Sequence, residues 1–255
     1  MKAVRKPDYG LDAPSAVRNL LIVAALGIVS LTTRLLGLWS RHDAIAAIAR
    51  PLMGAGLGCG AMGLWMIYDS KIGKLREREY FLDRIAWRGD ERVLDVGCGR
   101  GLFLVGAAKR LDTGGAVGID VWNAEDLSGN TPSAPLDNAM LEGVSDKVEV
   151  HTGDARRLPF ADATFDVVLS SMALHNIYNA GERQTAVREI ARVLKSGGRV
   201  LIADIRHLTQ YAATLRDAGV DARCVQGVIS SLLSVLTFGF VRFGYVIGSK
   251  PPRTN

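Results

Sequence analysis

A nine-residue stretch near the middle of the chain, residues 93–101, constrains the fold more than any other feature. It reads VLDVGCGRG, which predicts a short buried strand and then a glycine-rich turn whose backbone can approach a ligand closely. The apolar residues that follow, as far as Ala108, predict a helix that begins at about Arg100 and offers unpaired N–H groups. Strand, turn and helix in this order indicate the nucleotide-binding opening of a doubly wound α/β sheet.

The spacing of the glycines separates two classes of cofactor. A dinucleotide fingerprint, G-x-G-x-x-G, would place its third glycine at position 102, where the chain has leucine. Asp95, just before the turn, would repel a pyrophosphate and suits a ligand with an ammonium group. The stretch resembles motif I of the class I S-adenosylmethionine-dependent methyltransferases, D-x-G-x-G-x-G, matched by Asp95, Gly97, Gly99 and Gly101. The resemblance, which covers about residues 80–251, implies S-adenosylmethionine as cofactor and S-adenosylhomocysteine as product.

A second block follows at the spacing that this family uses. The next apolar run, AVGID, ends at Asp120, 25 positions after Asp95. A carboxylate at the end of a second strand can accept hydrogen bonds from both ribose hydroxyls of a nucleoside. By resemblance, Val121 and Trp122 pack against adenine; Trp122 as a wall of the core is the alternative interpretation.

A third block begins at Asp154. The resemblance implies that Asp154 meets the adenine amino group and that Ala155 offers its backbone N–H to the ring. Residues 165–170 then resemble the family's fourth strand, and Ser170 at its carboxyl end is expected to line the cofactor site. Downstream, REIARVLKSGG resembles the family's R-x-L-K-P-G-G turn, with Ser196 in place of proline.

The residues after the fourth strand are candidates for contacts with the methyl acceptor. In small-molecule members of the family a histidine at this point often faces the substrate, which makes His175 the candidate, with Asn176 and Tyr178 beside it. His175 has three interpretations: a general base, a group that binds and orients the acceptor, or a loop histidine without chemistry. The three cysteines lie far apart and show no metal-ligand spacing, so the chain is expected to hold neither a metal nor a disulfide framework.

Two apolar stretches precede Asp69. Residues 20–40 carry one charge, Arg34, and residues 51–68 carry none, and each stretch is close to the ~20 residues that cross a bilayer as a helix. Basic residues flank the pair on its outer sides, which predicts a hairpin with both ends, and the catalytic domain, on the cytoplasmic face of a membrane. Arg34 and Pro51 favour the alternative, in which the segments lie on the membrane surface or form a helical cap on the enzyme.

The predicted fold is α/β: a doubly wound, seven-stranded, mostly parallel sheet of the Rossmann-like methyltransferase type, whose last strand is antiparallel, with an N-terminal α-helical membrane hairpin. Four segments are expected: a polar start (1–18), the hairpin (19–69), a helical linker (70–90) and the methyltransferase domain (91–255). Two further stretches keep open interpretations. Residues 124–135 form a flap over the cofactor or a surface loop, and residues 229–240 form a lipophilic substrate wall, a second bilayer contact or a buried hairpin.

The net charge of +5 fits the basic flanks of the hairpin, and no basic stripe with interleaved aromatic residues predicts a nucleic-acid partner. Three functions compete. The first is a membrane-tethered methyltransferase for a small lipophilic acceptor such as a quinone precursor, a lipid or a thiol. The second is a methyltransferase for a soluble or protein acceptor, and the third is a non-catalytic, cofactor-binding membrane scaffold.

Overall fold

The structure is a computed structural model that describes residues 6–40, 44–226 and 244–252. The chain forms two compact units: Gly10–Leu75 with Asn123–Ser128, and Met1–Tyr9 with Arg76–Trp122 and Gly129–Asn255. Residues 229–240, for which the sequence left three interpretations, lie outside the described residues.

The larger unit is built on one seven-stranded sheet, ordered β3-β2-β1-β4-β5-β7-β6. Strands β1 to β5 are mutually parallel, and β7 runs antiparallel to both β5 and β6. The predicted seven-stranded sheet with an antiparallel last strand is therefore confirmed. The strands are β1 (Arg92–Val96), β2 (Gly115–Asp120), β3 (Val148–Thr152), β4 (Phe165–Ser171), β5 (Leu194–Asp204), β6 (Asp221–Gln226) and β7 (Gly244–Ser249).

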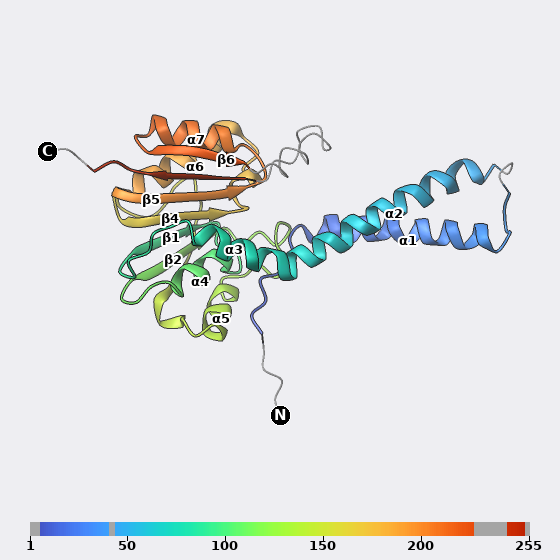
Figure 1. Ribbon diagram of the computed structural model, residues 1–255, viewed down its shortest axis with the longest axis horizontal. Coiled ribbons are helices and arrows are strands. Elements are labelled where there is room, and N and C mark those ends of the chain that lie inside the picture. The colour runs from blue at the N-terminus through green and yellow to red at the C-terminus, as the bar shows by residue number, and fades with distance from the viewer. Residues whose placement is uncertain (1–5, 41–43, 227–243, 253–255) are drawn as a thin grey trace, which may run out of the picture. The chain divides into compact units, whose positions relative to one another are not determined.

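Helices cover both faces of this sheet (Figure 1). One face packs against α6 (Ala180–Val193) and α7 (Leu208–Asp217), with β-strand side chains such as Leu94 and Val168 in the same buried cluster. The other packs against α3 (Lys74–Leu82), α4 (Leu102–Ala108) and α5 (Ala134–Leu141), with Val93 and Val167. Neighbouring residues of one strand thus face opposite clusters, as the period of two in a strand requires. Near-continuous apolar strands are what a sheet buried on both faces needs.

The strand order changes direction between β1 and β4, because β2 and β3 lie on one side of β1 and β4 and β5 on the other. In open α/β sheets, ligands bind at such a switch point, outside the carboxyl ends of the strands. The glycine turn that follows β1 occupies that position. The helix after it begins at Leu102 rather than Arg100, because Gly101 is its N-cap in the left-handed region at φ 83°.

The smaller unit contains the two apolar segments as helices, α1 (Pro14–Leu35) and α2 (Ala46–Tyr68), followed by the π-helical turn η1 (Asp69–Gly73). The helix pair is labelled in Figure 1. By length and composition both helices are able to cross a membrane. Many of their large apolar side chains are exposed, for example Ile28 and Leu57 at 65% and 78%.

Glycines allow the two helices to contact each other closely. An added Cβ on Gly56 would lie 2.6 Å from the Cα of Gly27, and an added Cβ on Gly60 would lie 3.3 Å from Ala24. The sequence contains two small-xxx-small pairs that would let two membrane helices approach closely, Gly54 with Gly58 and Gly56 with Gly60. Gly54 and Gly58 have open space beside them, so only the second pair faces α1. The reason is the helical period: residues two positions apart point to different sides of a helix.

Within the smaller unit, residues 123–128 pair with the segment that precedes α1. Asp12 forms an isolated antiparallel bridge with Leu127. The backbone N–H of Ser128 donates to the Leu11 carbonyl, and that of Ala13 donates to the Asp126 carbonyl. This stretch, the first half of the loop with two open interpretations, is therefore held by backbone hydrogen bonds to the start of the chain.

Candidate cofactor and acceptor site

The turn after β1 has a backbone that only glycine adopts easily. Gly97, Gly99 and Gly101 have φ values of 72°, 52° and 83°, in the left-handed region. Space is also short: an added Cβ on Gly97 would lie 2.2 Å from the Cβ of Ala173, and one on Gly101 would lie 2.9 Å from Pro135. Conformation therefore favours glycine at all three positions, and packing requires it at Gly97 and Gly101, before any ligand is considered.

Asp120 organises the space beside this turn. Its Oδ2 accepts the backbone N–H of Gly99 at 2.8 Å, and its Oδ1 accepts the backbone N–H of Trp122 at 2.6 Å. The side-chain amide of Asn130 also donates to Oδ1, at 3.3 Å. The residue is 9% exposed at the carboxyl end of β2. One carboxylate therefore links the glycine turn to the end of the second strand, where the resemblance places the ribose.

Asp95 and Ser170 lie on the neighbouring strands β1 and β4, and both side chains are buried. Within the described part of the chain, Asp95 Oδ1 and Ser170 Oγ have no hydrogen-bond partner. Burial raises the pKa of Asp95 to about 7; the backbone amide of Leu104 lowers it, and the charge of Asp120 raises it further. Asp95 faces the α3–α5 side of the sheet, as its register partner Leu169 does, and Ser170 faces the α6–α7 side. A buried polar group without a partner costs free energy, so each of the two oxygens is complementary to a missing donor. An ammonium group, such as the one on the methionine part of S-adenosylmethionine, fits that role at Asp95.

The residues expected around adenine differ in their exposure to solvent and in their contacts. Val121 is 62% exposed. Trp122 has a positive φ of 62°, donates its indole N–H to Thr152 Oγ1 at 2.8 Å, and packs partly against the core. Asp154 forms an ion pair with Arg156, which lowers the pKa of the carboxyl group. Ala155 packs partly against the core on the α6–α7 face.

A histidine–carboxylate pair lies at the carboxyl ends of β4 and β5, where Ser171 pairs with Ala203. His175, in the 3-10 turn η3 (Leu174–Asn176), places Nδ1 2.6 Å from Oδ1 of Asp204. The approach lies off the N–H direction and is a close polar contact rather than a well-formed hydrogen bond. The backbone N–H of His175 donates to Asp204 Oδ2 at 3.1 Å.

Asp204 is fully buried, and further donors hold it in place. The hydroxyl of Tyr211 donates to Oδ2 at 3.3 Å, and the backbone N–H of Ile205 donates to Oδ1 at 2.7 Å. Burial and the charge of Asp204 raise the pKa of Tyr211, so its hydroxyl remains a donor at neutral pH. Asp204 was not among the site residues predicted from the sequence. An aspartate at the carboxyl end of the apolar strand-five pattern was the available signal.

The other acceptor-side candidates are less enclosed. Asn176 is partly buried at the end of η3, and its backbone N–H donates to the Ala173 carbonyl. Tyr178 is 91% exposed and its side chain contributes to no enclosed site in the described chain. Among the described residues no group of His, Cys, Asp and Glu side chains could hold a metal ion, and Cys59, Cys98 and Cys224 are free thiols.

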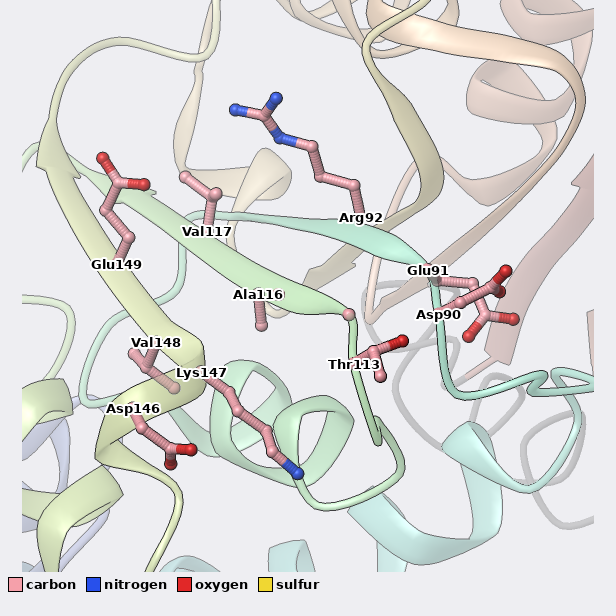
Figure 2. Close-up of a pocket in the computed structure, with 12 residues that line it drawn as sticks. Asp90, Glu91, Arg92, Thr113, Ala116, Val117, Asp146, Lys147, Val148 and Glu149 are labelled. Carbon is pink, nitrogen blue, oxygen red and sulfur yellow. The ribbon is translucent and has the colours of Figure 1, made fainter.

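A pocket also lies at the opposite edge of the sheet (Figure 2). It is lined by the residues that begin β1, β2 and β3, among them Arg92, Ala116 and Val148, together with Asp90 and Asp146. Ligands of open α/β sheets bind at the carboxyl ends of the strands rather than here. The pocket is therefore separate from the glycine turn and its carboxylates.

Comparison with known proteins agrees with this geometry. Residues 94–202 match the family described as "Methyltransferase domain". A 27-O-demethylrifamycin SV methyltransferase of Amycolatopsis mediterranei is 30% identical over 74% of this chain and 65% of its own length. A ubiquinone/menaquinone biosynthesis C-methyltransferase of Roseobacter denitrificans is 32% identical over 53% of this chain and 50% of its own length. The chain spans about half the length of the relatives it matches.

Solved structures share the fold at low sequence identity. A geranyl diphosphate methyltransferase in complex with S-adenosylmethionine has a TM-score of 0.53 and 16% identity, over 69% of this chain and 85% of that one. A [4+2]-cyclase has a TM-score of 0.52 and 24% identity, over 70% and 82%. The second similarity illustrates that one fold supports several chemistries, so function must come from the site. With the matched family, the glycine turn and the carboxylates at the switch point, the chain carries a class I S-adenosylmethionine-dependent methyltransferase domain.

Proposed function

We propose that the protein is a membrane-tethered methyltransferase that transfers a methyl group from S-adenosylmethionine to a small, lipophilic acceptor. One observation carries the proposal: the methyltransferase domain shares its chain with two helices, α1 and α2, that are long and apolar enough to cross a membrane. Exposure of their large apolar side chains to water is unfavourable, whereas the hydrocarbon core of a bilayer would solvate them.

In this proposal the cofactor lies across the switch point. Asp95 accepts from the ammonium group, Ser170 lines the site at the end of β4, and the turn of Gly97, Gly99 and Gly101 gives the methionine part room against the backbone. Asp120 holds the ribose hydroxyls. Four residues enclose adenine: Val121, Trp122, Asp154 and the backbone N–H of Ala155. The support is the positive φ of each glycine and the two buried oxygens without a partner in the described chain.

The cofactor supplies an electrophilic methyl group on a sulfonium, and the chain's own residues orient, hold and deprotonate the acceptor. We assign His175 as the general base and Asp204 as the residue that positions it. A carboxylate beside Nδ1 favours the tautomer whose other ring nitrogen, Nε2, accepts a proton. Contacts of this kind are often poorly aligned before the substrate binds and tighten in the complex. Asn176 and Tyr178 are the remaining acceptor-side candidates.

A base at this position indicates an acceptor atom that carries an exchangeable proton. A hydroxyl, a thiol or an acidic C–H of a quinone precursor meets that condition, because losing the proton makes the attacking atom more nucleophilic. Two relatives bear names of this kind: a ubiquinone/menaquinone biosynthesis C-methyltransferase and a 27-O-demethylrifamycin SV methyltransferase. Both act on small molecules by name, which supports a small acceptor here.

The hairpin supplies the membrane part of the proposal. Basic residues precede α1 and follow α2, so the positive-inside rule places the methyltransferase domain at the cytoplasmic face. Arg34, near the end of α1, donates to the Trp39 carbonyl and lies 5.4 Å from the centre of the Trp39 ring. Its charge is thus held at the far end of the helix, where a polar interface would accept it.

The test uses S-adenosylmethionine labelled on its methyl group. Purified full-length protein in detergent is incubated with membrane and cytosolic extracts, and the label is partitioned among an organic phase, an aqueous phase and precipitated protein. We expect label in the organic phase, lost in His175→Ala. Label confined to the aqueous phase or to protein would establish a soluble or protein acceptor, and absence of label from every fraction, with cofactor binding intact, would favour a scaffold.

A further inference from the structure

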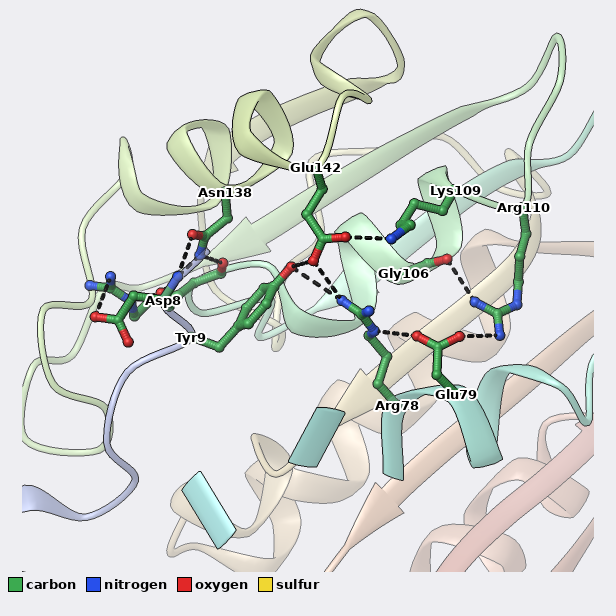
Figure 3. Close-up of polar contacts among 10 residues, drawn as sticks. Asp8, Tyr9, Arg78, Glu79, Gly106, Lys109, Arg110, Asn138 and Glu142 are labelled. Carbon is green, nitrogen blue, oxygen red and sulfur yellow. Dashed lines mark hydrogen bonds and ion pairs between the residues drawn. The ribbon is translucent and has the colours of Figure 1, made fainter. Parts of the chain in front are cut away.

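The N-terminal residues Asp8 and Tyr9 lie against the methyltransferase unit, beside α4 and α5 (Figure 3). The backbone N–H of Asp8 donates to Asn138 Oδ1 at 2.9 Å. The Asp8 carbonyl in turn accepts from Asn138 Nδ2 at 2.9 Å. Asn138 is only 2% exposed, so its amide binds the N-terminal backbone in both directions out of contact with water.

The same amide reaches the cofactor turn. Asn138 Nδ2 donates to the backbone carbonyl of Arg100, which lies between Gly99 and Gly101, at 2.8 Å. The Arg100 side chain returns to the N-terminal segment: Nε donates to the Asp8 carbonyl at 2.7 Å, and Nη2 lies 3.3 Å from the Asp8 carboxylate. A third donor, Nη1, binds the Gly129 carbonyl at 2.7 Å.

These contacts fix one peptide group of the turn at both ends. The carbonyl of Arg100 is held by Asn138, and the N–H of the following Gly101 donates to the Cys98 carbonyl at 2.8 Å. With both polar groups occupied, the peptide plane has one favoured orientation, and Gly101 is held at φ 83°. Without Asn138, that carbonyl and two backbone groups of Asp8 would lose a buried partner.

We propose that Asp8, Arg100 and Asn138 form a clasp that positions the cofactor turn, so that the N-terminal segment completes the cofactor site. Arg100 and Asn138 are positioning residues: they act through the backbone of the turn. A turn held in its binding conformation before the cofactor arrives loses less entropy on binding. The inference depends on the cofactor class and is independent of the acceptor.

A neighbouring contact provides a matched control. The hydroxyl of Tyr9 donates to Glu142 Oε1 at 2.8 Å and accepts from Arg78 Nη1 at 3.2 Å (Figure 3). This second anchor holds the same N-terminal segment. Within the described part of the chain, Glu142 pairs with Arg78 and Lys109, and none of these three residues belongs to the cofactor turn. Tyr9→Phe therefore removes buried hydrogen bonds of the segment and leaves the clasp in place.

The experiment compares full-length Asn138→Ala, Arg100→Ala, Arg100→Lys and Tyr9→Phe in detergent, with S-adenosylhomocysteine as the probe in titration calorimetry. We expect Kd to rise about tenfold in Asn138→Ala, which loses buried hydrogen bonds, and in Arg100→Ala, which loses three charge-assisted contacts of the clasp. Arg100→Lys keeps the charge and loses the forked donors, so its Kd should lie between that of Arg100→Ala and that of the wild type. Tyr9→Phe should change Kd less than about twofold while lowering the thermal midpoint as Asn138→Ala does.

A second measurement needs no cofactor. Hydrogen exchange of a peptide covering residues 93–105 in the ligand-free protein should be faster in Asn138→Ala and Arg100→Ala and unchanged in Tyr9→Phe. This result would show the clasp even if the cofactor assignment failed. Wild-type Kd and wild-type exchange in both clasp variants would overturn the proposal, as would equal losses of affinity in Tyr9→Phe and Asn138→Ala.

Discussion

The two halves of the sheet's carboxyl edge are built by different means. Beside β1 and β2, the site consists of the backbone of one short stretch, Gly97 to Gly101, and of the Asp120 carboxylate at the end of β2, which accepts a turn N–H. Beside β4 and β5, it consists of two side chains 29 positions apart, His175 and Asp204, that meet because the strands pair in parallel. The first half depends on conformation and the second on register, so the two should fail in different ways.

The largest effect of a change in the glycine turn should come from Gly97→Ala, which alters the backbone of the first half. The new methyl group would meet Ala173 at 2.2 Å in a left-handed conformation. Strain and collision together should weaken S-adenosylhomocysteine binding on the order of 100-fold. Gly143→Ala is the matched control, because Gly143 has a similar φ of 73° and open space beside it. Equal losses of cofactor affinity in the two variants, measured by calorimetry, would show that the short distance between Gly97 and Ala173 is not the cause of the loss.

The second half should respond in turnover rather than in cofactor affinity. Removal of a general base costs about 100-fold or more in rate, so His175→Ala should lower methyl transfer by that order. The Kd for S-adenosylhomocysteine should change little. His151→Ala, which removes a half-buried histidine of β3 that lies 2.7 Å from Glu149, should transfer methyl at the wild-type rate. If methyl transfer falls only in proportion to cofactor binding, His175 contributes to cofactor binding and is not the general base.

A pH titration sharpens the role assigned to Asp95. Its pKa is raised to about 7, mainly by burial, so the carboxyl group is neutral below that pH and cannot pair with an ammonium. Cofactor affinity is therefore present above pH 7 and lost as the pH falls. Between pH 8 and pH 6 the Kd for S-adenosylhomocysteine should rise about tenfold. Asp95→Asn should bind weakly at both pH values and show no slope, and a sloping profile in that variant would assign the dependence to another group.

The smallest effect should come from Asp154→Ala. The Asp154 carboxylate is already paired with Arg156, at 2.5 Å between the nearest oxygen and nitrogen. Its contribution to adenine binding should be about twofold to threefold in Kd, because an exposed, paired charge contributes little. In an Arg156→Ala background the same substitution should cost more. A large loss in the wild-type background would show that Asp154 leaves Arg156 when the cofactor binds.

What could be predicted from sequence follows the same division. The glycine turn and Asp120 were predictable, because a left-handed backbone and a carboxylate at a strand end leave local signals. His175 was visible as a candidate, but its partner Asp204 was not, since the register of β4 with β5 brings them together. Arg100 occupies a position that the motif leaves free. Its contact with Asp8, 92 residues away, leaves no signal in a single sequence.

In the hairpin, the sequence predicted the helices but not the faces through which they contact each other. Composition predicted both helices, and the structure contains them as α1 and α2. Composition did not show which glycines face the partner helix. The structure selects Gly56 and Gly60 and leaves Gly54 and Gly58 open, as a period near 3.6 residues requires. The pairing of Asp12 with Leu127 could not be predicted, because a single bridge between distant segments has no pattern.

The most direct test of the divided site measures two quantities on two variants of the full-length protein. The first quantity is the Kd for S-adenosylhomocysteine and the second is transfer of labelled methyl to the extracted acceptor. Asp120→Ala should raise Kd about 100-fold, because it loses the ribose contact and the hydrogen bond from Gly99. Asp204→Asn should keep the wild-type Kd and lose methyl transfer by about 100-fold. If Asp204→Asn transfers methyl at the wild-type rate, or if both variants lose binding equally, the division of the edge into a cofactor half and an acceptor half is wrong.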